Sequence, residues 1–369
     1  NRLGAPWQHV VDENIIARFV DSLLRGTSQV MFQNNPLTGL LILIGIFYNS
    51  LLLGGAAVLG LIVSTLTASA LGADRAMIRN GLFGFNGVLL GIGLAAFLQL
   101  NPALVIYIIL GAIVTTIIMA ALANLLNVWD VPALTAPFVL TAWFFIFAAF
   151  LFAHIRTNTT IHPALYVPTA SMETALRPVP TTTTGAGITA GNLAEALFRG
   201  VGEVFLQDNL VTGIIFVIAL LINSPASAAM SLIGSIVGII MALAVLGGNG
   251  YWVFHGLYGF NAVLCAIAIG GIFYVFSWRS VFYAILCAAI GTILMASLSV
   301  ILSPWGVPAL TGPFVIATWF FLFPKSIFHV LQPVALADVA TPELVRSQYI
   351  TREEYPPEIR PGGEIAPQP

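Results

Sequence analysis

Long apolar segments separated by short polar joints run through most of this chain. Segments of this kind, with charges confined to their ends, predict helices that cross a membrane. Ahead of them, residues 12–26 carry apolar side chains at helical spacing, which predicts an amphipathic helix along the membrane surface or across the bundle. The pattern therefore predicts an all-α polytopic membrane protein. The candidate spans are at about 36–53, 54–72, 86–99, 103–126 and 133–154, and again at about 210–223, 227–246, 261–276, 280–302 and 308–323.

Two further elements are too short to span the membrane. Asp74–Phe85 and Asn249–Phe260 each lie between the second and third segments of a set of five. At about 1.5 Å per residue, either one reaches only about 18 Å as a helix. Both end in Gly-Phe-Asn, where glycine lets the backbone leave helical geometry. We interpret them as re-entrant half-helices whose ends meet near a pore, because irregular backbone at membrane depth is tolerated where it is buried in protein or lines a cavity.

The second set of segments repeats the first in sequence as well as in pattern. The repeated pairs are Asp21–Asn35 with Glu195–Asn209, Gly81–Asn86 with Gly256–Asn261, and Trp129–Phe138 with Trp305–Phe314. The offsets are 174, 175 and 176 residues, so the duplication covers a whole half of the chain. With five spans in each half, the second half begins on the opposite side of the membrane from the first. We therefore expect two inverted repeats with the substrate path at their interface.

Composition agrees with a membrane location and excludes other classes of protein. Hydrophobic residues make up 59% of the chain and charged residues 8%, against about 25% charged residues in an ordinary soluble domain. The formal net charge is −2, and no basic face is available for binding nucleic acid. The two cysteines lie inside apolar segments, so neither a metal site nor a disulfide framework is indicated. No cofactor is expected.

These patterns divide the chain into five parts. An N-terminal amphipathic surface segment (1–26) precedes the first repeat (27–154). A connector rich in threonine and proline (155–192) leads to the second repeat (193–324). The last part is a polar C-terminal tail (325–369), which we expect to be exposed.

The repeated motifs resemble those of the urea transporter family of bacteria and vertebrates. The resemblance rests on the paired Val-Pro-Ala-Leu-Thr-x-Pro-Phe segments, on the doubled Gly-Phe-Asn, and on the segment Gln29–Pro36, and it extends from about Asp21 to Pro324. It implies a homotrimer in the inner or plasma membrane of the cell, with a pore in each protomer that conducts urea, or small analogues of urea, passively. It also implies a flattened slot with phenylalanine walls, a ladder of hydrogen-bond acceptors and a threonine from each half at the constriction.

The family pattern assigns a role to ten residues here. The acceptor positions are Gln29 and Glu203, and the central threonines are Thr135 and Thr311. The expected slot walls are Phe32, Phe85, Leu89, Val204, Phe260 and Leu264.

The chemistry of urea makes such a pore reasonable. Urea is small, planar and neutral, and it carries four N–H donors and one carbonyl acceptor. Aromatic faces above and below the plane, with oxygen acceptors along its edge, replace the water that urea loses. Without such replacement, moving a polar solute out of water costs on the order of several kcal/mol.

Several of these residues also have plainer interpretations. Thr135 and Thr311 could each bond a carbonyl one turn earlier in their own helices. Glu203 could cap the start of a span, or its charge rather than its acceptor oxygens could matter. Asn86 and Asn261 are expected to cap the backbone of the re-entrant elements rather than touch solute. Phe85 and Phe260 could be packing aromatics.

Other transport and enzyme classes fit the sequence less well. Asn101-Pro102-Ala103, a tripeptide used by aquaporin-type channels, occurs once and has no counterpart in the second half. An ammonium channel would need paired pore histidines, and an ion-coupled transporter would need charged groups at the midplane. No grouping of a nucleophile with a base, and no metal-binding motif, suggests an enzyme.

Overall fold

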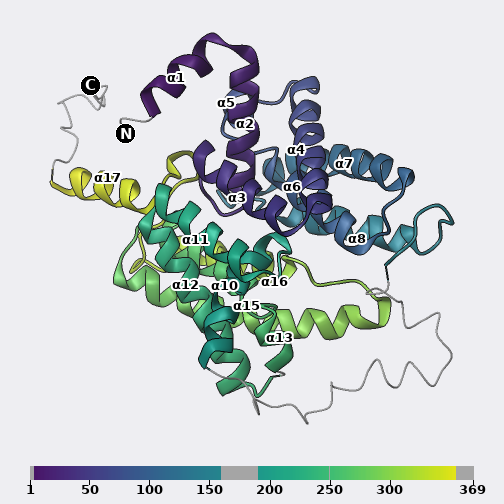
Figure 1. Cartoon of the computed structure of the whole chain (residues 1–369). Helices are drawn as coiled ribbons and strands as arrows, with labels where there is room; N and C mark the ends of the chain where they lie inside the picture. Colours follow the sequence, from purple (N-terminus) through teal and green to yellow (C-terminus); the bar gives the residue numbers. More distant parts are fainter. Residues whose placement is uncertain (1–3, 159–189, 249, 355–369) are drawn as a thin grey trace.

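The structure is all-helical over the residues that it describes. A computed structural model describes residues 4–158, 190–248 and 250–354. Only isolated bridges, and no strands, occur within these ranges. In Figure 1 the first half, in purple to blue, lies above the second half, in teal to yellow, and helices α3 and α11 lie near the boundary.

Within the described residues, each half contains five apolar helices in the same order. In the first half they follow α1 (Gly4–Glu13) and α2 (Ile15–Gln29), and in the second half they follow α10 (Ala190–Gly202) and the 3-10 turn η3 (Glu203–Phe205). The first set is α3 (Pro36–Asn49), α4 (Leu51–Ala70), α6 (Phe85–Phe97), α7 (Pro102–Asn127) and α8 (Ala136–Ala149). The second set is α11 (Leu210–Asn223), α12 (Pro225–Ile240), α14 (Phe260–Ile267), α15 (Trp278–Leu302) and α16 (Gly312–Leu322).

The apolar segments were thus predicted correctly, but their lengths were not. Four of the described helices are long and apolar enough to cross a membrane: α4, α7, α12 with the π-turn that follows it, and α15 with the turn that follows it. A fifth span results if α10–η3 and α11, which meet at a bend of 75°, are counted together. Shorter apolar helices of 10–17 residues are α3, α6, α8, and α14 with the π-turn that follows it. Prolines and left-handed residues delay the start of some of these helices, so hydropathy alone overestimated them.

Side-chain caps fix where several helices begin. Asn35 accepts hydrogen bonds from the first backbone N–H groups of α3, and Asn209 does the same for α11. Ser50 and Ser224 occupy the matching place before α4 and α12. Such residues satisfy N–H groups that have no partner inside the helix. The amphipathic helix predicted at 12–26 begins instead at Ile15, because Asn14 caps it and separates α2 from α1.

The two short elements differ from their predicted form. They are five-residue helices, α5 (Arg75–Arg79) and α13 (Gly250–Phe254), and each is followed by turns. Gly81 and Gly256 lie in those turns with φ of +74°, a conformation that glycine adopts without strain. Phe85 and Phe260 therefore begin the next helices, α6 and α14, instead of ending a half-helix. Asn249, the predicted first residue of the second element, lies outside the described residues.

Unusual backbone conformations recur at matched positions in the two halves. Leu134 and Leu310 are both left-handed, with φ of +53° and +52°. Left-handed conformations are uncommon for leucine, so their recurrence at an offset of 176 residues shows that the repeat extends to local backbone geometry. The other matched positive-φ pairs are Phe32 with Leu206, Gly72 with Gly247, Gly81 with Gly256, and Asp130 with Gly306.

Matched hydrogen bonds join the two halves along α3 and α11. The hydroxyl of Thr38 donates to the carbonyl of Ala219 at 2.8 Å, and the hydroxyl of Thr212 donates to the carbonyl of Gly45 at 3.0 Å. Thr212 is the counterpart of Thr38, and Ala219 is the counterpart of Gly45, so the second bond repeats the first with the two halves exchanged. The side chains of Asn49 and Gln207 form a further contact at 2.9 Å, and those of Asn223 and Gln33 form its counterpart at 2.7 Å.

The part predicted as an exposed tail contains a packed helix. In α17 (Pro342–Glu354), the Glu343 carboxylate accepts hydrogen bonds from the Ser224 hydroxyl and from the backbone N–H of Ala226, both at 2.8 Å. Val345 is buried. Residues up to 354 therefore include a segment held against the start of α12. Residues 355–369, and 159–189 of the predicted connector, lie outside the described residues.

Candidate functional site

The two predicted central threonines meet. Thr135 and Thr311 are buried, and their hydroxyl oxygens lie 2.7 Å apart, so one hydroxyl donates to the other. Each threonine comes directly before the first residue of a helix, α8 or α16. Neither makes the bond to a carbonyl one turn earlier that was the plainer interpretation. The motif from each half therefore brings its hydroxyl to a shared point.

An asparagine side chain forms hydrogen bonds with the backbone before and after each threonine. The Asn86 side chain accepts from the backbone N–H of Phe138 at 3.1 Å and donates to the Leu134 carbonyl at 3.4 Å. Asn261 makes the same two bonds to Phe314 and Leu310, at 3.0 and 3.2 Å. The expectation that these asparagines cap the re-entrant elements was wrong. They hold the loops that lead into Thr135 and Thr311, which are called the threonine loops below, because α6 and α14, which carry the asparagines, pack against those loops.

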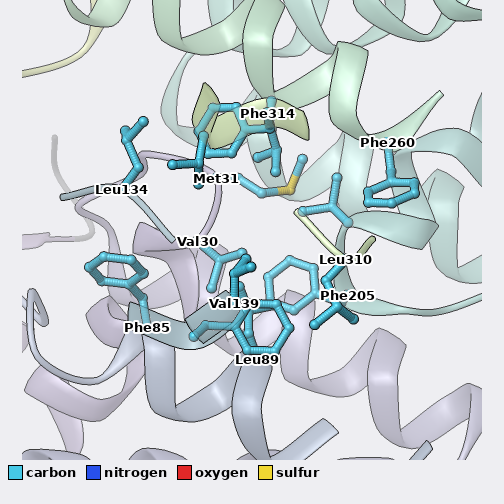
Figure 2. Close-up of a cluster of buried hydrophobic side chains, with 14 of the residues drawn as sticks. Val30, Met31, Phe85, Leu89, Leu134, Val139, Phe205, Phe260, Leu310 and Phe314 are labelled. Atoms are coloured by element: carbon cyan, nitrogen blue, oxygen red, sulfur yellow. The ribbon is translucent and has the colours of Figure 1, made fainter. Parts of the chain in front are cut away.

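A small cavity lies beside the threonines and is lined by residues from both halves. Its volume of about 10 Å³ is at the lower limit for holding one water molecule. Figure 2 shows Leu89 on a helix of the first half and Phe260 on a helix of the second, with Leu310 between them in this view. The lining residues are Leu89, Phe138, Glu203, Val204, Leu206, Phe260, Leu310 and Thr311.

Half of the predicted site residues line this cavity. They are Leu89, Glu203, Val204, Phe260 and Thr311. Three lining residues were missed: Phe138, Leu206 and Leu310. Phe138 and Leu310 belong to the repeated Val-Pro-Ala-Leu-Thr-x-Pro-Phe motif, which was the signal that could have identified them.

Glu203 is the one ionisable residue of the cavity lining. It is 6% exposed, and it begins η3, where the chain bends between α10 and α11. None of the described residues donates a hydrogen bond to its carboxylate. The following helix, α11, is capped by Asn209, so Glu203 is not its cap. Its acceptor oxygens are therefore available to a donor that enters the cavity.

Gln29, the counterpart of Glu203, has a different environment. Its side-chain nitrogen donates to the carbonyl of Asn80 at 2.9 Å. That bond orients the side-chain amide of Gln29. The matched positions thus share an acceptor oxygen, but only Gln29 is oriented by a donor bond.

The three remaining predicted wall residues lie outside the cavity lining. Phe32 makes edge-to-face contacts with Phe273 and Phe314, with ring centroids 5.6 and 6.1 Å apart. Phe85 and Leu264 are buried. The position that matches Phe32 holds the smaller Leu206, which lines the cavity. The structure therefore shows the small cavity beside Leu206 and close ring packing around its counterpart, Phe32.

Charged residues near the repeated segments pair with one another. Arg25 donates to Asp21 at 2.6 Å, and Arg199 donates to Asp208 at 2.5 Å. The ring of His255 also contacts Asp208. Each of these matched arginines is thus held in an ion pair with an acid of its own half. No group of three potential metal ligands occurs within the described part of the chain.

One ion pair ties the first threonine loop to the end of the second half. Asp130, which begins the approach to the loop, pairs with Lys325 at 2.7 Å and also accepts from the backbone N–H of Leu336. Its counterpart is Gly306.

Comparison with known proteins gives one consistent family. The family model described as Urea transporter matches residues 20–326, which include both copies of the repeat. Urea transporter 1 of Ovis aries is 33% identical over 336 residues, which cover 90% of this chain and 84% of that protein. Urea transporter 1 of Rattus norvegicus is 33% identical over 314 residues, which cover 84% of this chain and 78% of that protein.

Proposed function

Because the chain belongs to the urea transporter family, we propose that it conducts urea passively across a membrane through a narrow pore between its two halves. The pore passes the contact between Thr135 and Thr311. Gln29 and Glu203 supply acceptors on its two sides, and Phe32, Phe85, Leu89, Val204, Phe260 and Leu264 form its walls.

The small cavity is the observation on which this proposal rests. It combines acceptor oxygens, at Glu203 and Thr311, with apolar walls contributed by both halves. A planar solute with N–H donors on its edges and uncharged faces matches that combination. An ion would lose far more hydration energy than these few groups return.

The threonine pair is the constriction in this proposal. Urea passes only when the two hydroxyls separate, because the cavity beside them holds at most about one water. A hydroxyl both donates and accepts. Each freed hydroxyl therefore bonds either the carbonyl or an N–H group of urea, and the bond between the threonines is exchanged for bonds to the solute.

We also propose that the halves are inverted repeats, bounded as the sequence indicates at 27–154 and 193–324. The exchanged bonds between α3 and α11 support a two-fold relation, since each donor in one half has its counterpart in the other. An odd number of crossings per half gives the inversion. The proposed assembly is a homotrimer in a cell membrane, with one pore in each protomer.

Urea flux in proteoliposomes tests the proposal. We expect entry of labelled urea down its gradient, at a rate that is unaffected by a sodium gradient, a proton gradient or a membrane potential. Empty liposomes and liposomes with heat-inactivated protein are the controls. Accumulation of urea against its gradient when an ion gradient is applied would show a coupled transporter and overturn the channel assignment.

A further inference from the structure

Two tryptophans cross between the halves to hold the threonine loops. The indole N–H of Trp143, in α8 of the first half, donates to the carbonyl of Pro308 at 2.9 Å. The indole N–H of Trp319, in α16 of the second half, donates to the carbonyl of Pro132, also at 2.9 Å. The same bond is thus made twice with the halves exchanged.

Each of these carbonyls lies three residues before a threonine of the constriction. Between Pro132 and Thr135 the chain is not helical, and Leu134 is left-handed. Asn86 holds this loop at Leu134 and at the N–H of Phe138. The bond to Pro132 therefore holds the part of the loop that Asn86 does not reach, and its donor comes from the opposite half.

The two tryptophan bonds link each threonine loop to the helix that follows the other threonine. Thr135 leads into α8, which carries Trp143, and Trp143 holds the loop of Thr311. Thr311 leads into α16, which carries Trp319, and Trp319 holds the loop of Thr135. The threonine hydroxyls meet between these two linked loops. A shift of one helix is thus transmitted to the threonine of the other half.

Trp143 also packs directly beside the second threonine. A Cβ atom added to Gly312, the residue after Thr311, would lie 3.4 Å from the Trp143 ring. The matching position in the first half is Ala136. That distance is an ordinary van der Waals contact, so the Trp143 ring lies against the chain next to Thr311.

We infer that Trp143 and Trp319 are positioning residues that set the separation of Thr135 and Thr311, and so determine which small amides pass. The inference rests on the proposed function for its link to solute choice. The positioning itself is a statement about geometry, and it has its own test. Neither tryptophan needs to touch the solute.

The first test measures the geometry without any transport. In a Cys265→Ala, Cys287→Ala background, Thr135→Cys and Thr311→Cys place two thiols where hydroxyls now lie 2.7 Å apart, within reach of a disulfide. Trp143→Phe or Trp319→Phe removes the N–H and keeps an aromatic ring. We expect each to slow disulfide formation under a mild oxidant at least threefold.

The matched controls are Trp129→Phe and Trp305→Phe. These tryptophans occupy equivalent places in the two halves, lie close to the same loops in sequence, and are 54% and 47% exposed. We expect them to leave the rate of disulfide formation unchanged. If the Trp143 and Trp319 variants also leave it unchanged, or if the controls slow it equally, the positioning role is overturned.

The second test concerns solute choice. In proteoliposomes we expect Trp143→Phe and Trp319→Phe to raise the permeability ratio of N-methylurea to urea at least threefold, at unchanged recovery of folded protein. A parallel fall of both permeabilities, with the ratio constant, would overturn the role in solute choice. If the wild-type protein conducts no urea while the disulfide rates respond as expected, the proposed function fails and the positioning role stands.

If a phenylalanine variant is not recovered folded, 3-benzothienylalanine replaces the tryptophan. That residue keeps the bicyclic ring and lacks only the N–H donor. The same outcomes then apply to both tests.

Discussion

Glu203 and Gln29 show that equivalent residues need not be equivalent in environment. Both offer an oxygen on a two-carbon arm, but Gln29 is oriented by Asn80, whereas Glu203 lies in the cavity with no donor among the described residues. A carboxylate in such a place acts either through its oxygens or through its charge. Two substitutions at this one residue separate these possibilities.

We expect Glu203→Gln to retain most urea flux and Glu203→Leu to reduce it several-fold. The glutamine keeps an acceptor oxygen, whereas the leucine removes a hydrogen bond of about 1 kcal/mol, which corresponds to about fivefold. Flux at matched protein content in proteoliposomes measures the effect. Full flux in the leucine variant would exclude an acceptor role, and loss of flux in the glutamine variant would show that the charge is needed.

We expect Thr135→Val and Thr311→Val each to lower urea flux by about fivefold. Valine keeps the shape of threonine, but it removes a hydroxyl that bonds the solute, worth about 1 kcal/mol. Thr292→Val is the control, because Thr292 is buried and bonds only the carbonyl of Ala288 in its own helix. Equal flux in all three variants would remove the threonines from the pore.

At this scale the sequence predicted the threonines and missed their supports. The family resemblance assigned Thr135 and Thr311 to the centre, and the structure shows that their hydroxyls meet. Trp143 and Trp319 were not identified, because their bonds reach Pro308 and Pro132 in the opposite half, and hydropathy contains no information on such contacts. Leu206 was missed because its role depends on a left-handed backbone that leucine rarely adopts.

At the scale of elements, the close packing of α4 on α6 depends on small residues. A Cβ atom on Gly60 would lie 2.1 Å from the carbonyl oxygen of Gly87, which is backbone and cannot move aside. Gly55, on the same helix, has open space around it. The apolar pattern predicted both helices but gave no sign of which glycine lies at the contact, because both occur in one uninterrupted apolar segment.

We expect Gly60→Ala to destabilise the protein by about 1–3 kcal/mol, the usual range for overpacking. Gly55→Ala should change stability by about 1 kcal/mol or less, since only helix propensity is affected. The fraction of monodisperse protein that remains after heating in detergent compares the two. Equal thermal profiles would show that α4 and α6 separate easily.

At the scale of the whole molecule, the sequence contains direct evidence for the repeat of the two halves and none for contacts between copies. The repeat was visible because 174–176 residues separate its members throughout. A trimer leaves no such trace within one chain, because its contacts join one copy to another. The trimer therefore comes only from the family resemblance.

We expect native mass spectrometry in detergent to show a trimer as the main species. Association between apolar helix surfaces in a membrane depends on close packing, and many large apolar side chains of α7 and α15 are exposed on the single chain. A variant that dissociates should still conduct urea, because the proposed pore is built from the two halves of one chain. A wild-type protein found only as monomer or dimer would contradict the expected assembly.

The exchanged bonds between α3 and α11 have a consequence for how the protein is made. The ribosome releases the first half before the second exists, so Thr38 and Asn49 enter the bilayer before Ala219 and Gln207 have been synthesised. Polar groups in hydrocarbon without partners are costly. We therefore expect the newly synthesised first half to stay with the insertion machinery until α11 has been synthesised. The two halves would then enter the lipid together.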